Sequence, residues 1–458
     1  MSVLHFDINL AKKYATAGPR YTSYPTALKF TDCVDRVDLL HEMRVHNRPE
    51  RPLSLYFHLP FCYSLCWFCG CTQVITHDQS KSSRYIDYLM REMRKMRLNI
   101  HPVRKAVQMH WGGGTPTFLR PDEIRELGSE IQHFFPFDEK AEVSVEIDPR
   151  RLTEDHVKAL REVGFNRASM GVQDINPEVQ EAVHRFQTHE HNTQALDWLH
   201  TAGFHSVNMD LIYGLPHQTA ATFEKTLDVI LEYNPDRLAV YNYAHVPWMR
   251  PAQKLLNESA LPDPEEKIRM LKLIVERLTG AGYVYIGMDH FAKYDDELAE
   301  AQRQKKLQRN FQGYSTHAGT DIYAFGMSSI SQVGNAYYQN VKDLKQYYDH
   351  VSNDLWPLER GYILNRDDQI RHRVIMELMC NLELDYDALS RELDIDFRRY
   401  FRNSLNQFED MESDGLLEVS DDRMVVSLTG RLFIRNIAMK FDAYLGEKKA
   451  EKSFSQTV

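Results

Sequence analysis

The chain has 458 residues, of which 43% are hydrophobic and 26% are charged, proportions typical of a globular protein with one large domain and one or two smaller ones. The formal net charge of −10 argues against a general surface for nucleic acid or for an anionic membrane. No apolar run approaches the roughly 18 residues that span a bilayer, and the first residues lack the apolar region of a signal peptide. We therefore expect a cytoplasmic protein with no nucleic-acid partner and no membrane partner.

Residues 1–50 contain the segment GPRYTSYPT (Gly18–Thr26). Its two prolines and one glycine exclude a regular helix, so we expect an extended arm. From these residues alone, a plain surface connector is the simpler interpretation of the arm.

From residue 51, short apolar runs alternate with amphipathic segments, which is typical of βα units. Helical periodicity is clearest over Ser83–Met96 and Thr153–Val163. The six predicted strands are Leu53–Leu59, Ala106–Trp111, Glu142–Ile147, Arg167–Val172, Ser206–Ile212 and Arg237–Tyr243, with a possible seventh at Tyr283–Gly287. Six units in series predict an α/β fold with an open, partial (β/α)6 barrel rather than a closed eightfold barrel.

Four of the six cysteines lie in one window, Cys62–Cys71, directly after the first predicted strand, with the spacing C-x3-C-x2-C-x-C. A zinc site would need a second pair of ligands about a dozen or more residues away, and no such pair follows. Compact cysteine runs are typical of iron–sulfur clusters, although the bacterial ferredoxin run is C-x2-C-x2-C. Structural thiols or a redox disulfide are the alternative, which the distance of Cys33 and Cys380 in the sequence disfavours.

Polar residues follow most of the predicted strands, and parallel α/β sheets gather functional groups at the carboxyl ends of their strands. In chain order, these segments are the cysteine window, Gly112–Pro116, Glu146–Pro149, Gly171–Asp174, Asp210–Pro216 and Asn242–His245. Their convergence on one rim is the strongest argument from the pattern alone that the chain is an enzyme.

Individual residues at this rim have two interpretations. Glu146, Gln173, Asp210 and Arg185 suit a ligand, because carboxylates accept from ribose hydroxyls or an ammonium group and arginine holds a carboxylate, but each could instead form a salt bridge in a βα loop. The triple glycine Gly112–Gly114 lacks the lysine of a Walker loop; it either brings backbone close to a ligand or forms a flexible turn.

Basic residues are also ambiguous. Four histidines near strand ends are expected to be mainly structural, since the chain has 20 histidines; they are His58, His110, His245 and His290. Three arginines are candidates for holding an acidic substrate, with a solvated surface position as the alternative for each; they are Arg20, Arg303 and Arg309.

Residues 361–458 have three helical patterns, then Leu417–Val419, a polar turn, Met424–Ser427 and another helix, which is the order of a winged helix. This region carries 19 Asp and Glu against 14 Lys and Arg, so it lacks the positive charge that phosphate binding requires. We expect a mostly helical, winged-helix-like domain that serves as a structural cap or a substrate lid. The last dozen residues are polar and are expected to fray.

Nine segments together resemble the oxygen-independent coproporphyrinogen III oxidase family of the radical S-adenosylmethionine (radical SAM) superfamily. They are Pro19–Ala27, Tyr56–Phe61, Cys62–Cys71, His110–Thr117, Ser144–Arg150, Ser169–Asp174, Asp210–Pro216, Gly287–Ala292 and Arg309–Tyr314. A related haem chaperone shares the barrel and three of the cysteines, but it typically lacks both the N-terminal arm and the fourth cysteine, Cys71.

The resemblance implies a radical SAM barrel and an oxygen-independent reaction of haem biosynthesis. Two propionate side chains of coproporphyrinogen III would be oxidatively decarboxylated to vinyl groups through a 5′-deoxyadenosyl radical, giving protoporphyrinogen IX. One [4Fe-4S] cluster would be held by Cys62, Cys66, Cys69 and S-adenosylmethionine, and two S-adenosylmethionine molecules would bind. An electron donor such as flavodoxin or ferredoxin would serve the cluster, and the chain would act as a monomer.

The resemblance also implies particular residue roles and a division into domains. Catalytic roles fall on Tyr56 and Cys71. Contacts with S-adenosylmethionine are implied for Tyr56, Phe68, Gly113, Gly114, Thr115, Glu146, Gln173, Arg185, Asp210, Ala244 and Ile330. The domains would be an arm and substrate-facing segment (1–50), the barrel with its extension (51–360) and the helical domain (361–458). A haem-carrying chaperone and an iron–sulfur electron carrier are the alternative functions.

Overall fold

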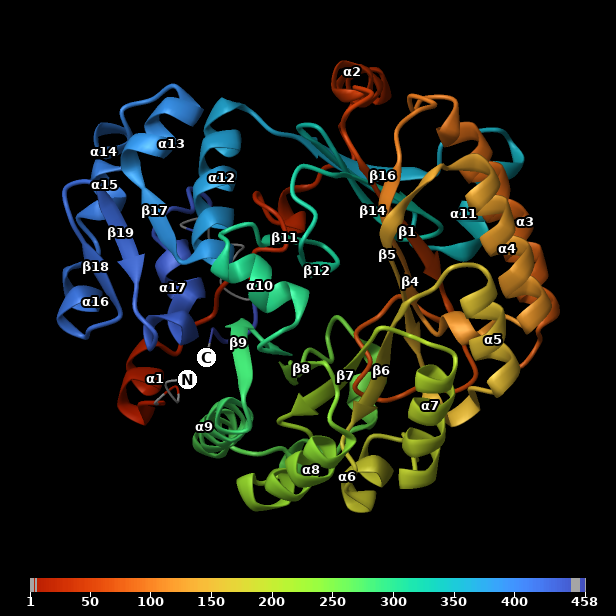
Figure 1. The fold of residues 1–458 in the computed structure, drawn as a ribbon, viewed down its shortest axis with the longest axis horizontal. Helices are drawn as coiled ribbons and strands as arrows, with labels where there is room; N and C mark the ends of the chain where they lie inside the picture. Colours follow the sequence, from red (N-terminus) through yellow and green to blue (C-terminus); the bar gives the residue numbers. More distant parts are fainter. Residues whose placement is uncertain (1–3, 5, 446–453, 458) are drawn as a thin grey trace.

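A computed structural model describes residues 4, 6–445 and 454–457, and a sheet of twelve strands forms its centre (Figure 1). Seven neighbouring strands of this sheet run parallel. In spatial order they are β13 (Asp321–Phe325), β1 (Leu53–Leu59), β4 (Ala106–Gly113), β5 (Phe137–Ile147), β6 (Arg167–Gln173), β7 (Ser206–Tyr213) and β8 (Arg237–Asn242). The six predicted strands are confirmed, and β13 is an additional strand beside β1.

Antiparallel strands extend the sheet at both edges. They are β14 (Ile330–Val333), β15 (Ala336–Asn340) and β16 (Leu358–Ile363) beyond β13, and β10 (His290–Lys293) and β9 (Tyr283–Gly287) beyond β8. The possible seventh strand is therefore present as β9, although β10 lies between it and β8. In the part of the chain that the structure describes, β9 and β16 do not pair with each other, so the barrel is open, as predicted.

Helices cover the outer, convex face of the curved sheet (Figure 1). They are α3 (Ser80–Arg97), α4 (Pro121–Phe134), α5 (Glu154–Glu162), α6 (Pro177–Ala182), α7 (His189–Thr201), α8 (Ala220–Tyr233) and α9 (Pro264–Gly280). Both predicted helices are confirmed: α3 begins three residues before Ser83, and α5 begins where the Thr153 side chain caps the backbone N–H of His156.

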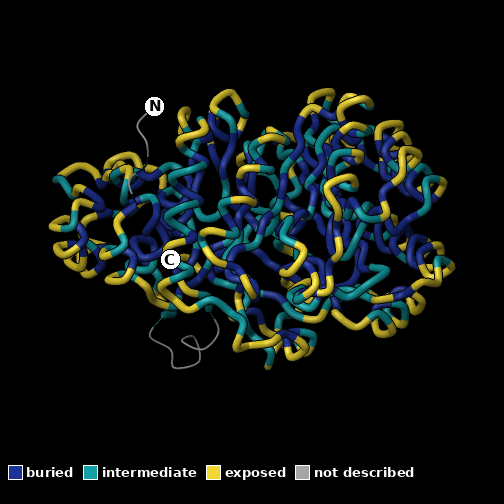
Figure 2. Tube along the Cα trace, turned by 90° about the horizontal axis from the view of Figure 1, so that it is seen from below, coloured by how far each residue is buried: buried dark blue, intermediate teal, exposed yellow. Residues whose placement is uncertain are grey.

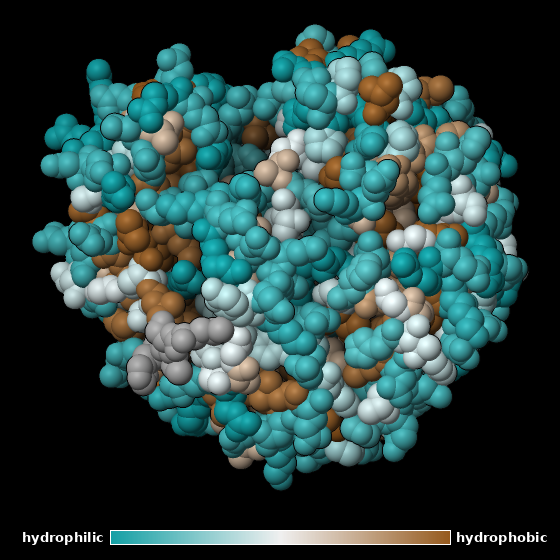
Figure 3. All heavy atoms as spheres, viewed as in Figure 1, coloured by the Kyte–Doolittle hydropathy of each residue, from teal (hydrophilic) through white to brown (hydrophobic). Residues whose placement is uncertain are grey.

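The barrel strands alternate between buried apolar residues and polar residues. On β5, Val143, Val145 and Ile147 belong to the core under the helices, whereas Glu142, Ser144 and Glu146 line a cavity inside the barrel. The core accordingly lies between sheet and helices. Figure 2 shows that buried segments run through the interior, with exposed segments at the periphery. The face in Figure 3 is mostly hydrophilic, with apolar residues in separate patches.

The C-terminal region is mostly helical, as predicted. Its helices are α12 (Arg366–Asn381), α13 (Tyr386–Leu393), α14 (Phe397–Tyr400), α15 (Arg402–Leu405), α16 (Glu409–Ser413) and α17 (Ile434–Met439). The predicted hairpin is present as β18 (Leu417–Val419) and β19 (Arg423–Val426), and an unpredicted third strand, β17 (Glu383–Asp385), pairs with β19.

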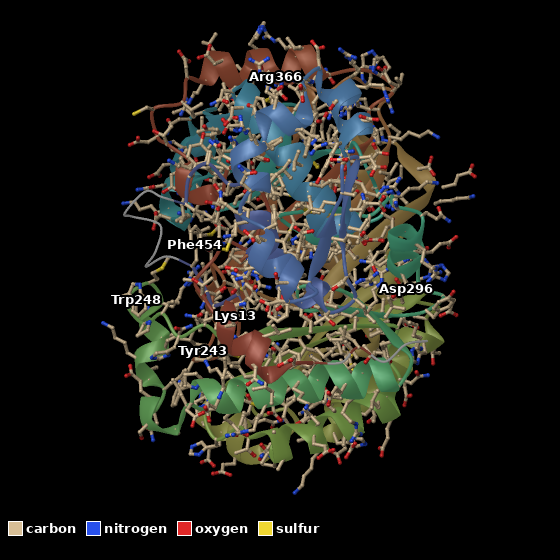
Figure 4. The ribbon with its side chains drawn as sticks, turned by 90° about the vertical axis from the view of Figure 1, so that its left-hand side faces the viewer. Lys13, Tyr243, Trp248, Asp296, Arg366 and Phe454 are labelled. Atoms are coloured by element: carbon tan, nitrogen blue, oxygen red, sulfur yellow. The ribbon has the colours of Figure 1, made fainter. Side chains whose placement is uncertain are left out.

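The N-terminal segment joins the barrel to the C-terminal region. Its helices are α1 (Ile8–Tyr14) and α2 (Arg36–His46), with the predicted non-helical arm between them. Lys12 pairs with Glu265 of α9, and Lys13 pairs with Asp414 just after α16; Figure 4 shows Lys13 between these two bodies.

The arm is held by the C-terminal end of the chain. Gly18 N–H donates to the carbonyl oxygen of Ser455 (3.0 Å), and Thr457 N–H donates to that of Thr16 (2.7 Å). The prediction of fraying is wrong for residues 454–457, because their backbone groups pair with the arm; the rest of the last dozen residues (447–453 and 458) lie outside the described residues. No helix among the described residues is long and apolar enough to cross a membrane.

Candidate active site

The cysteine window forms a loop that is fastened at both ends. It leaves the sheet through β2 (Phe61–Cys62) and returns through β3 (Val74–Ile75), which pairs with β2. Val74 N–H donates to the carbonyl oxygen of Pro60 (2.7 Å), and Thr76 N–H donates to that of Cys62 (3.0 Å). The loop is therefore fixed at the carboxyl end of β1, where the sequence places it.

Two arginine side chains lie close to the thiols of this loop. The Cys66 sulfur lies 3.7 Å from Arg150 Nη2 and 3.5 Å from Arg185 Nη1. A hydrogen bond from Cys71 lowers the pKa of the Cys69 thiol to about 7, whereas burial raises the pKa of the Cys62 thiol to about 12. Two guanidinium groups beside the loop would stabilise a site that gathers several thiolates.

The donor set of the loop fits an iron–sulfur cluster better than a single metal ion. All six cysteines have free thiols, so no disulfide uses them. Within the described residues, no group of three or more His, Cys, Asp or Glu side chains converges closely enough to hold one metal ion. A cluster needs thiolates that are spread over the corners of a larger body, which is what a loop with the spacing of Cys62, Cys66 and Cys69 offers.

The triple glycine brings strand β4 against its neighbours. An added Cβ would lie 2.9 Å from Glu146 Oε1 at Gly112, 2.6 Å from the His58 ring at Gly113 and 2.4 Å from the Pro60 carbonyl oxygen at Gly114. Gly113 also has a φ of +115°, which disfavours any side chain. Because Gly112 and Gly113 are the last residues of β4, the triplet is not a flexible turn. The triplet therefore packs closely against neighbouring protein atoms, and its contact with a ligand stays a prediction.

A polar network links the predicted residues on β1, β4 and β5. The Tyr56 hydroxyl lies 3.1 Å from His58 Nδ1, and the Tyr56 ring stacks on His110 at 5.9 Å. Glu146 Oε1 lies 3.3 Å from His110 Nε2, and Glu146 Oε2 accepts from the Gly113 N–H (3.1 Å). The structure thus brings Tyr56, Gly113 and Glu146 together, and it adds His58 and His110, which sequence reasoning had assigned to structural roles.

Glu146 and Asp210 are two of the carboxylates that line the inner cavity of about 170 Å³, and their environments differ. Burial raises the pKa of Glu146, but the hydrogen bonds from His110 and Gly113 outweigh burial, so its pKa lies below the usual value. Burial raises the pKa of Asp210 to about 6, although it accepts from Ser169 Oγ (2.8 Å). Glu146 therefore stays ionised near neutral pH, while Asp210 is able to exchange a proton.

Arg185 connects the cysteine loop to the end of β6. Its Nη2 donates to the Gly171 carbonyl oxygen (2.5 Å), and its Nη1 lies 3.4 Å from Asp148. Burial raises the pKa of Asp148, but Arg185 and Arg150 outweigh burial and hold its pKa well below the usual range. Gln173 lies beside the same glycine with a φ of +68°. Arg185 is thus a neighbour of the cysteine loop, and Gln173 lies near Arg185 at Gly171.

The remaining predicted contacts lie in three places. Thr115 Oγ1 lies 3.5 Å from the Cys62 sulfur. Gln253 Nε2 donates to the carbonyl oxygens of Phe68 (3.2 Å) and Ala244 (3.3 Å), which ties these two segments together. Ile330 instead begins β14, where it packs against the cluster of Phe30, Tyr337 and Leu364 rather than beside the polar strands β4 to β8.

Three arginines from distant segments meet near this cavity. They are Arg20 of the arm, Arg309 of β11 (Gln308–Asn310) and Arg435 of α17. Arg309 Nε donates to the Arg20 carbonyl oxygen (3.4 Å), and Arg20 pairs with Asp289. Burial, Arg20 and Arg309 together lower the pKa of Arg435 to about 9. Among the described residues Asp289 is the one carboxylate ion-paired with these three, so the cluster carries excess positive charge.

Several buried polar atoms around the cavity have no hydrogen-bond partner among the described residues. They include Arg309 Nη1, His290 Nδ1 and both amide atoms of Gln312. His290 and Gln312 line the cavity, and Arg309 stacks on Tyr314, which also lines it. Buried polar groups are normally satisfied, so these atoms indicate a place for a ligand. In contrast, Arg303 is exposed and donates to the Tyr294 carbonyl oxygen, which is the solvated surface position that the sequence analysis gave as its alternative.

The alternation of polar and apolar residues along each strand could have revealed the cavity-lining residues that the sequence analysis did not single out. The polar residues of β4 to β8 recur at every second position, for example Gln108 and His110 or Asn208 and Asp210. Attention to strand ends alone overlooks this period of two.

The chain is similar to known proteins over its whole length. A family model described as the radical SAM superfamily matches residues 56–230, and one described as the HemN C-terminal domain matches residues 364–433. Curated relatives named oxygen-independent coproporphyrinogen III oxidase, from Salmonella typhimurium and from Escherichia coli strain K12, are each 46% identical, with 99% of each chain covered. The solved structure of coproporphyrinogen III oxidase from Escherichia coli, described as a radical SAM enzyme, has a TM-score of 0.92 at 44% identity, covering 97% of this chain and 100% of that one.

The open parallel barrel with a cysteine-rich loop at the end of β1 is the fold of a radical SAM enzyme, and this chain is one. That class implies an iron–sulfur cluster of the [4Fe-4S] type and S-adenosylmethionine. Within the superfamily, the chain belongs to the oxygen-independent coproporphyrinogen III oxidases.

Proposed function

We propose that the chain catalyses the oxygen-independent oxidative decarboxylation of two propionate side chains of coproporphyrinogen III, giving protoporphyrinogen IX for haem biosynthesis. The observation that carries this proposal is the full-length identity of 46% to enzymes of that name, joined to a cysteine loop at the end of β1 and a polar cavity lined by residues of β4 to β8. The excess positive charge of the arginine cluster supports an anionic substrate, as four propionates would require.

The cofactors would be held by the residues that the resemblance implies. We propose Cys62, Cys66 and Cys69 as ligands of the cluster and two S-adenosylmethionine molecules as its companions. When bound, these groups would supply the 5′-deoxyadenosyl radical that removes hydrogen from the propionate β-carbon. Arg185, already 3.5 Å from the Cys66 sulfur, is suited to hold the carboxylate of S-adenosylmethionine. Glu146, which remains ionised, is suited to accept from its ammonium or ribose hydroxyls.

The chain's own groups would orient the tetrapyrrole. Arg309 has one buried guanidinium nitrogen without a partner among the described residues, so a substrate carboxylate there would satisfy both charges. Arg20 presents a second guanidinium from the arm, which Arg435 fixes through the carbonyl oxygens of Gly18 and Pro19. The C-terminal region thus has a positioning role for the arm, more specific than a cap or lid.

Several sequence-based expectations stay predictions. They are a catalytic role for Tyr56 and Cys71, the domain limits at residues 50 and 360, a flavodoxin or ferredoxin as electron donor, a monomeric state and a cytoplasmic location. The cofactor contacts that stay predictions are those of Tyr56, Phe68, Gly113, Gly114, Thr115, Gln173, Asp210, Ala244 and Ile330.

An anaerobic assay tests the proposed function. Protein with a reconstituted cluster is incubated with coproporphyrinogen III, S-adenosylmethionine and dithionite, and porphyrin products are separated after oxidation. We expect the dicarboxylic vinyl product from the wild-type protein and none from a Cys66→Ser variant. A wild-type protein that binds haem tightly but leaves coproporphyrinogen III unchanged would contradict the proposal and favour a haem-carrying relative.

A further inference from the structure

A second hollow, of about 430 Å³, lies against the cysteine loop and opens to the surface. The cysteine loop contributes residues 62–64 to its wall, and the segment after β4 contributes Thr115 and Thr117. The rest comes from the segment after β5, the α6–α7 connection and the start of α7. It shares no lining residue with the inner cavity. An occupant of this hollow would therefore reach the cysteine loop without taking the space of the substrate.

The wall of the hollow is fastened directly to the cysteine loop. His184 stacks on Trp67 (5.4 Å between ring centroids), and its Nδ1 lies 3.0 Å from the Leu65 carbonyl oxygen. The guanidinium group of Arg151 lies over the Tyr63 ring at 4.7 Å. A partner that touches this wall is thus at most a few residues from the thiols.

The hollow is locally positive in a negatively charged protein. Arg150 and Arg151 line it, and the one lining carboxylate among the described residues is Asp148. Asp148 is already paired with Arg150 (2.6 Å) and Arg185 (3.4 Å), so it does not offset the charge of Arg151. Arg151 is exposed and has no ion-pair partner in the part of the chain that the structure describes.

A large apolar side chain lies beside these charged groups. Phe186 lines the hollow and is 58% exposed. Its ring lies edge-on to His184, 6.2 Å between centroids, so aromatic and basic groups form one surface. Exposed aromatic side chains ringed by charge are typical of protein interaction sites.

We propose that this hollow is the docking site of a small acidic one-electron carrier protein, which delivers electrons at the cysteine loop. The inference rests on the proposed function, because that reaction consumes an electron from outside the chain for each cleavage of S-adenosylmethionine. In the transfer, the carrier is oxidised by one electron and the iron–sulfur site is reduced by one; no covalent bond forms or breaks. Electron-transfer complexes of this kind have small, weak interfaces whose association depends on charge.

Charge reversal at Arg151 tests the docking site. The cluster-reconstituted wild-type protein is compared with Arg151→Glu and with a matched control, Arg399→Glu, which makes the same charge change on exposed α14 at the far side of Figure 1. The probe is purified flavodoxin, an acidic flavoprotein. Its affinity is measured by titration at low and at moderate salt, and its hydroquinone form is mixed with each protein while bleaching of the cluster is followed.

We expect Arg151→Glu to weaken flavodoxin binding and to slow cluster bleaching by roughly five- to tenfold at low salt, with a smaller effect at moderate salt. Bleaching by dithionite should stay unchanged, and Arg399→Glu should match the wild type. If Arg151→Glu binds flavodoxin as tightly as the wild type and its cluster bleaches as fast at low salt, the proposed docking site is refuted. Equal losses in both variants would also overturn it, since they would reflect net charge alone.

Failure of the proposed function has a separate signature. If the wild-type protein with dithionite forms no vinyl product, the proposed reaction is wrong, whether or not flavodoxin binds. If the wild type forms product but Arg151→Glu binds flavodoxin normally, only the docking site is wrong.

Discussion

Gly114→Ala should separate strand β4 from the cysteine loop. The added Cβ would lie 2.4 Å from the Pro60 carbonyl oxygen and 2.8 Å from that of Phe61, where ordinary contacts begin at 3.4 Å, so the backbone must move by about 1 Å. That shift lengthens two hydrogen bonds, from Gly114 N–H to Leu59 O (2.8 Å) and from Thr115 N–H to Phe61 O (2.9 Å). Two weakened bonds at about 1 kcal/mol each, with overpacking of about 1–3 kcal/mol, give a loss of roughly 3–5 kcal/mol.

Urea unfolding of the apoprotein measures the lost stability, and iron content after reconstitution measures the effect on the loop. We expect a lower unfolding midpoint and less bound iron for Gly114→Ala. The control is Gly280→Ala in α9, where an added Cβ meets no atom within 4 Å and alanine is favoured in a helix. Gly114→Ala with the wild-type midpoint and full iron content would refute the claim that β4 and the loop are in obligatory contact.

Three further substitutions test other parts of the site. Cys69→Ser should lose the cluster, whereas Cys71→Ser should keep its iron and lose turnover; normal turnover of Cys71→Ser would exclude a catalytic role for that thiol. Arg309→Gln should raise KM for coproporphyrinogen III by about tenfold or more, with a smaller change in kcat, because a charge-assisted hydrogen bond of about 1.5–3 kcal/mol is lost. The exposed control Arg303→Gln should leave KM unchanged. A wild-type KM for Arg309→Gln would remove Arg309 from the substrate site. Buried Glu92 has a pKa raised from 4.5 to about 7 by burial, so the folded state keeps a proton that the unfolded state loses between these pH values. The free energy of unfolding should therefore fall by up to about 3 kcal/mol from pH 4.5 to pH 7, and Glu92→Gln should abolish this part of the slope, as urea unfolding at several pH values would reveal; an unchanged slope would show that Glu92 is ionised throughout.

Local patterns predicted the centre of the fold. The strands of the six βα units are apolar runs between amphipathic helices, and they appear where the pattern places them. Strand β13 was missed because it pairs with β1 across more than 260 residues, and no local periodicity reports such a partner. Strand β10 was missed because the chain reverses within two residues, Met288 and Asp289, the first with a φ of +57°.

For the site as well, local patterns predict some residues, and tertiary contacts decide the others. The cysteine loop is readable because its spacing is local, and Glu146, Asp210 and Arg185 are readable because strand ends converge in a parallel sheet. The joint action of Arg20, Arg309 and Arg435 is not readable, since these residues come from an arm, a short hairpin and a terminal helix whose docking depends on tertiary contacts. That His110 and His290 face the cavity is also not readable, because one sequence does not show which histidines face a cavity.

One isotope measurement tests the central claim most directly. Coproporphyrinogen III carrying deuterium at the propionate β-carbons is converted anaerobically by the cluster-reconstituted protein, and 5′-deoxyadenosine is analysed by mass spectrometry. The account predicts that vinyl product and 5′-deoxyadenosine form together and that the 5′-deoxyadenosine contains deuterium. Vinyl product without deuterium in 5′-deoxyadenosine would contradict hydrogen abstraction from the propionate as the reaction of this site.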